Sequence, residues 1–109
     1  MRGGLLAWVA VSLMIGGCGE DARPPVGGRG DAERGRIVYL AQCVACHNPD
    51  PSKPGSLGPP VKGSPRDLLE ARLILGTYPP GHKPKRESSV MQPMPHLVAA
   101  LPDLEAFLK

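Results

Sequence analysis

The sequence predicts an all-α fold with long irregular loops, and three observations lead to this prediction. No segment of the 109 residues alternates polar and apolar side chains with period two, as a half-buried strand does. Three segments instead have the apolar spacing or the capping residues of helices. Gly and Pro contribute 14 residues each and gather mostly outside these segments, where they predict loops.

The first helix is expected from Ala32 to about Gln42, with Asp31 as its N-terminal cap. Gly35 lies in the middle of this helix, where a glycine costs about 1 kcal/mol relative to alanine. A glycine tolerated at this position indicates that another part of the chain packs very close to the helix backbone.

The second helix is expected to begin at Pro65, with Ser64 as its cap and Asp67 three residues after the cap. Gly76 is expected to end it. The apolar residues of this helix that should share one face are Leu68, Ala71 and Leu75, with Leu69 and Leu73 beside them.

The last helix is expected within residues 98–108, where Pro102 is compatible only with the first turn. Two Pro-rich loops, residues 48–63 and 77–95, connect the helices. Loops this long are uncommon in a small domain unless they wrap something. Aromatic residues make up 4% of the chain, so the core is small and a disulfide, metal or large cofactor is needed to hold the domain together.

Residues 1–17 have the build of a secretory signal peptide: a basic start, an apolar run over residues 5–15, and small residues before Cys18. The residues that lead into Cys18 resemble a bacterial lipobox, which implies that this thiol carries a diacylglyceryl group after cleavage. We therefore expect export to the periplasmic side of a bacterial membrane, with residues 18–30 as a lipid-anchored flexible tether. An ordinary cleavable signal with an unrelated cysteine, or an uncleaved anchor, are the alternative interpretations.

The net charge of +3 is too small to indicate nucleic-acid binding, and the basic residues form no helical stripe. One basic cluster spans residues 82–86. It is interpreted either as a solvated loop or as a docking patch that attracts acidic partner proteins.

Cys43, Cys46 and His47 form the Cys-x-x-Cys-His motif of haem c attachment. One helical turn brings positions i, i+3 and i+4 to a common face. The two thiols can then bond to the vinyl groups of one porphyrin while the imidazole reaches the iron. The motif predicts one covalent haem c with His47 as an axial ligand.

Two other chemistries use a Cys-x-x-Cys pair. A thioredoxin-like redox pair needs a βαβ context, which this sequence lacks. A zinc site needs a second Cys or His pair with suitable spacing, whereas His82 and His96 are single and far apart.

Residues 31–109 resemble the class I c-type cytochromes. Gly35 and Tyr39 match a glycine and an aromatic residue in the first helix of that family, and residues 58–63 match its Gly-Pro-x-aliphatic-x-Gly segment. The Met-Pro pair at residues 94–95 matches the pair before the final helix, and residues 105–108 are similar to its closing Ala-Tyr-Leu.

The chain departs from the family pattern in two places. Pro102 interrupts a helix that is usually continuous in the family. Phe107 replaces the commoner tyrosine, which keeps the packing against Gly35 and removes a hydroxyl.

The resemblance implies a cytochrome c domain over residues 31–109, in which three main helices and long loops wrap one haem. It also implies that the carbonyl of Pro59 accepts the ring N–H of His47, and that Met94 is the second iron ligand. Met91 is the alternative, because these are the only two methionines after the signal peptide. His82 and His96 are the remaining candidates.

The predicted function is one-electron transfer between redox partner proteins, without enzymatic activity. The alternatives are a haem enzyme, or a gas or redox sensor, with an open or labile sixth ligand. A module for disulfide exchange is the third hypothesis.

Overall fold

Asp31 begins the first helix, α1 (Ala32–Gln42), in the computed structural model, which describes residues 29–109. Its Oδ1 accepts the backbone N–H groups of Glu33 and Arg34 at 2.9 and 3.0 Å. These bonds satisfy two of the backbone N–H donors that every helix start leaves unpaired. They also lower the pKa of Asp31, and the bond from Arg34 has the largest effect. The predicted cap and bounds of this helix are confirmed.

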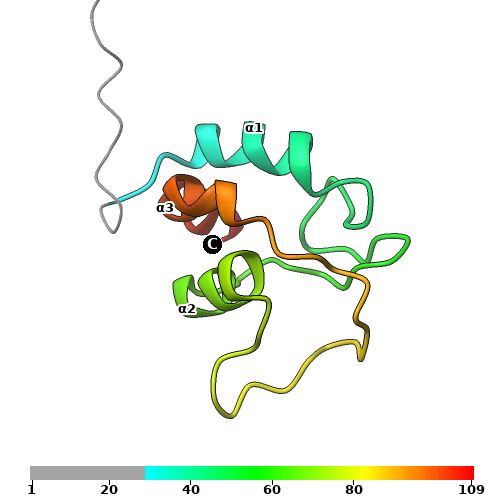
Figure 1. Cartoon of the computed structure of the whole chain (residues 1–109). Helices are drawn as coiled ribbons and strands as arrows, with labels where there is room; N and C mark the ends of the chain where they lie inside the picture. Colours follow the sequence, from blue (N-terminus) through cyan, green and yellow to red (C-terminus); the bar gives the residue numbers. More distant parts are fainter. Residues whose placement is uncertain (1–28) are drawn as a thin grey trace, which may run out of the picture.

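The backbone of α1 crosses that of the last helix, α3 (Leu101–Leu108), at Gly35 (Figure 1). A Cβ built on Gly35 would lie 1.9 Å from the carbonyl oxygen of Asp103 and 2.9 Å from Cβ of Phe107. The ring of Phe107 also contacts that of Tyr39, with 5.4 Å between the ring centroids. The close approach predicted from the glycine is confirmed.

The same crossing holds the one buried charged side chain among the described residues, Asp103, which is 7% exposed. Its carboxylate accepts the backbone N–H of Asp31 at 2.7 Å and Nε of Arg34 at 3.2 Å. A buried carboxylate needs such partners, because leaving it unpaired costs more than the pair contributes. Asp103 therefore ties the start of α1 to the first turn of α3.

Gly35→Ala should lower the free energy of unfolding by about 1–3 kcal/mol, because the added methyl group meets backbone atoms of α3 that cannot move aside. At an exposed helix position the same change would stabilise the protein by about 0.5–1 kcal/mol. The sign of the change in unfolding free energy therefore distinguishes close packing from an exposed position. Urea unfolding of the purified variant and wild type measures the difference. A midpoint at or above that of the wild type would contradict the packing described here.

The second helix, α2 (Arg66–Glu70), begins one residue later than expected and without the predicted cap. The hydroxyl of Ser64 donates to the carbonyl of Val61 at 2.6 Å instead, and Pro65 occupies the cap position with no side-chain bond. The capping prediction was wrong because the preceding turn competes for the same hydroxyl.

A π-helical turn, η1 (Ala71–Leu75), continues α2 and ends at Gly76, as predicted for that glycine. Gly76 adopts the left-handed conformation, with φ of 70°. The wider π turn changes which side chains face inwards. Leu73 is buried, whereas Leu75, predicted on the core face, is 65% exposed.

The last segment is divided in two: a 3₁₀ helix, η2 (Pro95–Ala100), leads directly into α3. Pro102 lies in the first turn of α3, the one place where its missing N–H has no cost. The single helix expected over residues 98–108 therefore begins as a 3₁₀ turn.

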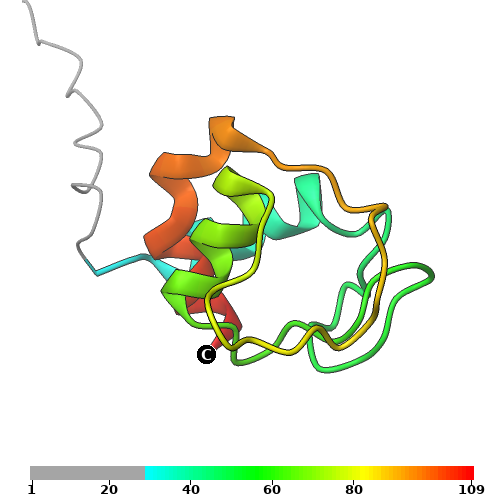
Figure 2. The same ribbon diagram turned by 60° about the horizontal axis from the view of Figure 1, so that its bottom comes forward.

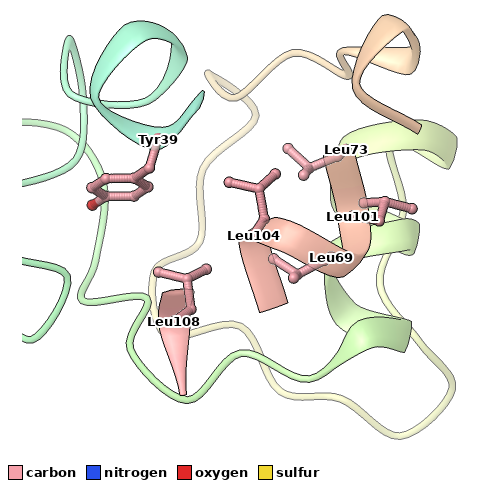
Figure 3. Packing of buried hydrophobic residues seen from close by; sticks show 6 residues of the cluster. All are labelled: Tyr39, Leu69, Leu73, Leu101, Leu104 and Leu108. Atoms are coloured by element: carbon pink, nitrogen blue, oxygen red, sulfur yellow. The ribbon is translucent and has the colours of Figure 1, made fainter. Parts of the chain in front are cut away.

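Leucines fill the space between α2, η1 and α3, and Figure 3 shows them gathered there with Tyr39 from α1 nearby. The buried cluster comprises Tyr39, Leu69, Leu73, Leu101, Leu104 and Leu108. Figure 2 shows the two long loops extending from the helices on one side of the domain. The all-α prediction is confirmed for residues 29–109, which contain three α-helices and no strand.

Two predictions fall outside the described residues: the signal peptide, residues 1–17, and lipidation of Cys18. Most of the predicted tether, residues 18–30, also lies outside them. Within residues 29–109, no helix is long and apolar enough to cross a membrane.

Candidate functional site

A cavity of about 320 Å³ lies between the leucine cluster and the two long loops. Its volume is within the range of roughly 300–1,000 Å³ that is typical of ligand pockets. The candidate residues from the sequence that line it are Cys43, Cys46, His47, Pro59, His82, Met91 and Met94. Apolar side chains of the core, including Leu69, Leu73 and Leu104, form its wall.

The Cys-x-x-Cys-His motif forms one turn that continues from the end of α1. Cys43 caps α1, and its N–H donates to the carbonyl of Tyr39. The carbonyl of Cys43 in turn accepts the N–H groups of Cys46 and His47 at 3.2 and 2.9 Å. All three residues of the motif line the same cavity.

Burial raises the pKa of the Cys43 thiol to about 11. This thiol is therefore protonated at neutral pH. Tyr39, beside it at the end of α1, donates its hydroxyl to the carbonyl of Asn48 at 2.6 Å. Burial raises the pKa of Tyr39 to about 12.

The imidazole of His47 is held from two sides by the loop that follows the motif. Nδ1 of His47 lies 3.0 Å from the carbonyl oxygen of Pro59 and donates to it in the tautomer that leaves Nε2 free. A Cβ built on Gly58 would lie 2.4 Å from Cε1 and Nδ1 of the ring, so only glycine fits there. The N–H groups of Leu57 and Gly58 both donate to the carbonyl of Cys46, which fixes this loop against the motif.

Met91 and Met94 border the cavity from the loop before η2, and both are partly buried against the core. The backbone of Met94 is bonded on both sides: its N–H donates to the carbonyl of Leu73 at 2.6 Å and its carbonyl accepts from Leu97 at 3.0 Å. The backbone of Met91 makes no hydrogen bond to the described residues. Of the two histidine alternatives, His82 lines the cavity and His96 does not.

Cationic side chains border the cavity, and no Asp or Glu does so in the described part of the chain. Arg72, Lys85 and Arg86 have no ion pair with a carboxylate among residues 29–109. Nζ of Lys85 donates to the carbonyl of Pro60 at 2.8 Å. The Arg72 guanidinium lies 4.3 Å from the ring centre of Tyr78, and the ring of His82 stacks on the same tyrosine.

The sequence did not predict three contributions to this site. The sequence assigned a role only to Pro59 in the segment 58–63. The glycine at position 58 could have indicated that another group packs against the backbone there. Arg72 lies on the predicted second helix, and no local pattern says which way a helical arginine points. The bond from Met94 to Leu73 joins residues far apart in the sequence.

No three His, Cys, Asp or Glu side chains gather into a metal-binding group within residues 29–109. Comparisons of the chain with protein-family models, with characterised proteins and with solved structures found no match.

Proposed function

We propose that this protein is a one-electron carrier with a single covalently attached haem c, of the class I cytochrome type. One observation carries the proposal: the two thiols and the imidazole of a Cys-x-x-Cys-His motif border a cavity that two methionines also border. His47 and Met94 would be the axial ligands, with Met91 as the alternative. When bound, the haem iron supplies the ferric–ferrous couple.

The residues around the cavity suit a haem in three respects. Leucine side chains offer an apolar wall to the flat faces of a porphyrin. Cys43 and Cys46 are free thiols available for thioether bonds. Arg72, Lys85 and Arg86 are cations without carboxylate partners in the described chain, and they would hold the two carboxylate side chains of the porphyrin.

The role of the protein would be to fix the iron ligands and to exclude water. The Pro59 carbonyl would orient His47 and raise the basicity of Nε2, the other ring nitrogen. A methionine opposite histidine raises the reduction potential. With both ligands held in place, little rearrangement accompanies electron transfer, which suits a carrier.

Disulfide exchange is less well supported. Exchange requires a thiolate, and reactive cysteines have lowered pKa values. Burial instead raises the pKa of Cys43 to about 11. The other alternative, a haem enzyme or sensor with an open sixth position, is disfavoured by two methionines that border one cavity.

The visible spectrum of protein produced in a periplasm with haem-attachment machinery tests these functions against each other. A carrier should give low-spin haem with a methionine-to-iron charge-transfer band in the ferric state. High-spin haem would support the enzyme or sensor. A colourless protein without a Soret band would support thiol exchange.

The partners would be redox proteins that donate and accept the electron. Lys83 and Arg86 are exposed in the basic cluster, and Arg86 borders the cavity. Their positive charge favours acidic partner surfaces, most strongly at low ionic strength.

We further propose that the mature protein begins at Cys18 and is held by its lipid on the periplasmic side of a bacterial membrane. Cys18→Ser should release the protein from membranes or leave the precursor uncleaved, because the lipid is attached to this thiol. Membrane fractionation and intact mass measure both results. A fully soluble wild type, together with normal cleavage of the variant, would contradict the anchor.

A further inference from the structure

The C-terminal end of η1 has an unusual set of backbone hydrogen bonds. In an uninterrupted α-helix, the carbonyl of Leu73 would accept the N–H of Thr77, four residues on. Here the N–H groups of both Gly76 and Thr77 donate to the carbonyl of Ala71. The carbonyl of Leu73 is therefore available to a partner outside the helix.

That partner is the N–H of Met94, which donates to the Leu73 carbonyl at 2.6 Å. The neighbouring Pro93 packs on the same helix end, since a Cβ built on Gly76 would lie 3.4 Å from its Cγ. Pro93 and Met94, which are consecutive residues of the loop that carries both methionines, thus contact the end of η1. Met94 contacts the carbonyl of Leu73, and Pro93 lies beside Gly76.

The loop before Met94 has few other anchors, of which the contact of Met91 with the core and the bond from Lys85 to Pro60 are two. Residues 85–90 and residues 92–93 are exposed. The side chain of Leu73, by contrast, is buried in the leucine cluster and borders the same cavity as Met94. The bond therefore connects the loop that carries Met94 to the buried leucine cluster.

We propose that Gly76 is a positioning residue for Met94. Its left-handed conformation ends the helix so that Leu73 offers its carbonyl, which fixes the backbone of Met94 and directs the thioether towards His47 across the cavity. The inference rests on the proposed function for the role of the thioether, and on the backbone contacts alone for the position of Met94.

Substitutions at Gly76 separate conformation from size. Gly76→Val should disrupt the helix end, because a β-branched residue does not adopt a positive φ without strain. Gly76→Asn should preserve it, since Asn tolerates this conformation and its Cβ would make an ordinary contact with Pro93. Gly81→Val is the matched control: Gly81 has φ of 77° and no atom within 4 Å of a built Cβ.

Two measurements on the haem-loaded protein test the proposal. The first is the methionine-to-iron charge-transfer band, and the second is hydrogen exchange of the Met94 amide. Gly76→Val should weaken or remove the band and make the Met94 amide exchange about tenfold faster, as expected for the loss of one hydrogen bond. Gly76→Asn and Gly81→Val should leave both signals close to those of the wild type.

The proposal is overturned if Gly76→Val keeps both the band and the slow exchange, or if Gly81→Val changes them equally. A wild type without the band would refute methionine ligation, whereas exchange of the Met94 amide would still report whether Gly76 positions it. Gly76→Ala provides a milder change should the valine variant not accumulate.

Discussion

Replacing Cys43 and Cys46 together by Ser is expected to abolish covalent haem attachment completely. Both thiols lie on the turn that presents His47 to the cavity, and no other cysteine lies within residues 29–109. The exported wild type should exceed its polypeptide mass by one haem, and denatured wild type should remain coloured. The double variant should show neither property.

The same variant should also lose much of its stability. Within residues 29–109, the buried hydrophobic core comprises eight residues, all of them leucines apart from Tyr39 and Ala71. A core of that size is marginal for a domain with such long loops. Circular dichroism should show a low-temperature or non-cooperative transition, whereas Cys18→Ser, the matched control, should retain its haem and its unfolding midpoint. Colour that persists in the denatured double variant would refute the proposed attachment.

The first helix and the turn that holds the Cys-x-x-Cys-His residues could be predicted from sequence because their determinants are local. Asp31 caps the turn that immediately follows it, and its bonds reach only two and three residues along the chain. The motif residues lie within one turn, so helical geometry alone brings them together. Gly35 was informative in the same way, since a glycine inside a helix has few explanations other than close packing.

The rest of the site depends on contacts between distant segments. Ser64 had the sequence signature of a cap, but its hydroxyl bonds to the turn before it. The π turn followed no pattern in the sequence and reversed the expected burial of Leu75. The preference for Met94 over Met91 was implied by a family resemblance, whereas the structure adds a physical difference in how their backbones are bonded.

Met94→Ala is expected to leave the haem attached and to remove the charge-transfer band. The reduction potential should fall, because a thioether opposite histidine raises it and its replacement by water or a lysine does not. The free energy of unfolding should fall by about 2 kcal/mol or more, since the side chain is partly buried against the core and its ligand bond pins a long loop. Potentiometry and urea unfolding measure these effects.

Met91→Ala is the matched control, because Met91 borders the same cavity and is partly buried on the same core. It should keep the band and the potential and lose only a small packing contribution. The reverse result, with the band lost in Met91→Ala and kept in Met94→Ala, would make Met91 the ligand. The bond between the Met94 amide and Leu73 would then position the loop without positioning the ligand.

A spectrum unchanged in both variants would mean that the partner of His47 is not a methionine. The position of each histidine relative to the cavity then ranks the two remaining candidate ligands. His82 borders the cavity, stacked on Tyr78, whereas His96 is exposed and lies outside the cavity wall. His82→Ala should in that case convert the haem to high spin, while His96→Ala should leave it low spin. Because His82 borders the cavity whether or not it binds the iron, a change in potential alone would not establish it as the ligand; the change of spin state would.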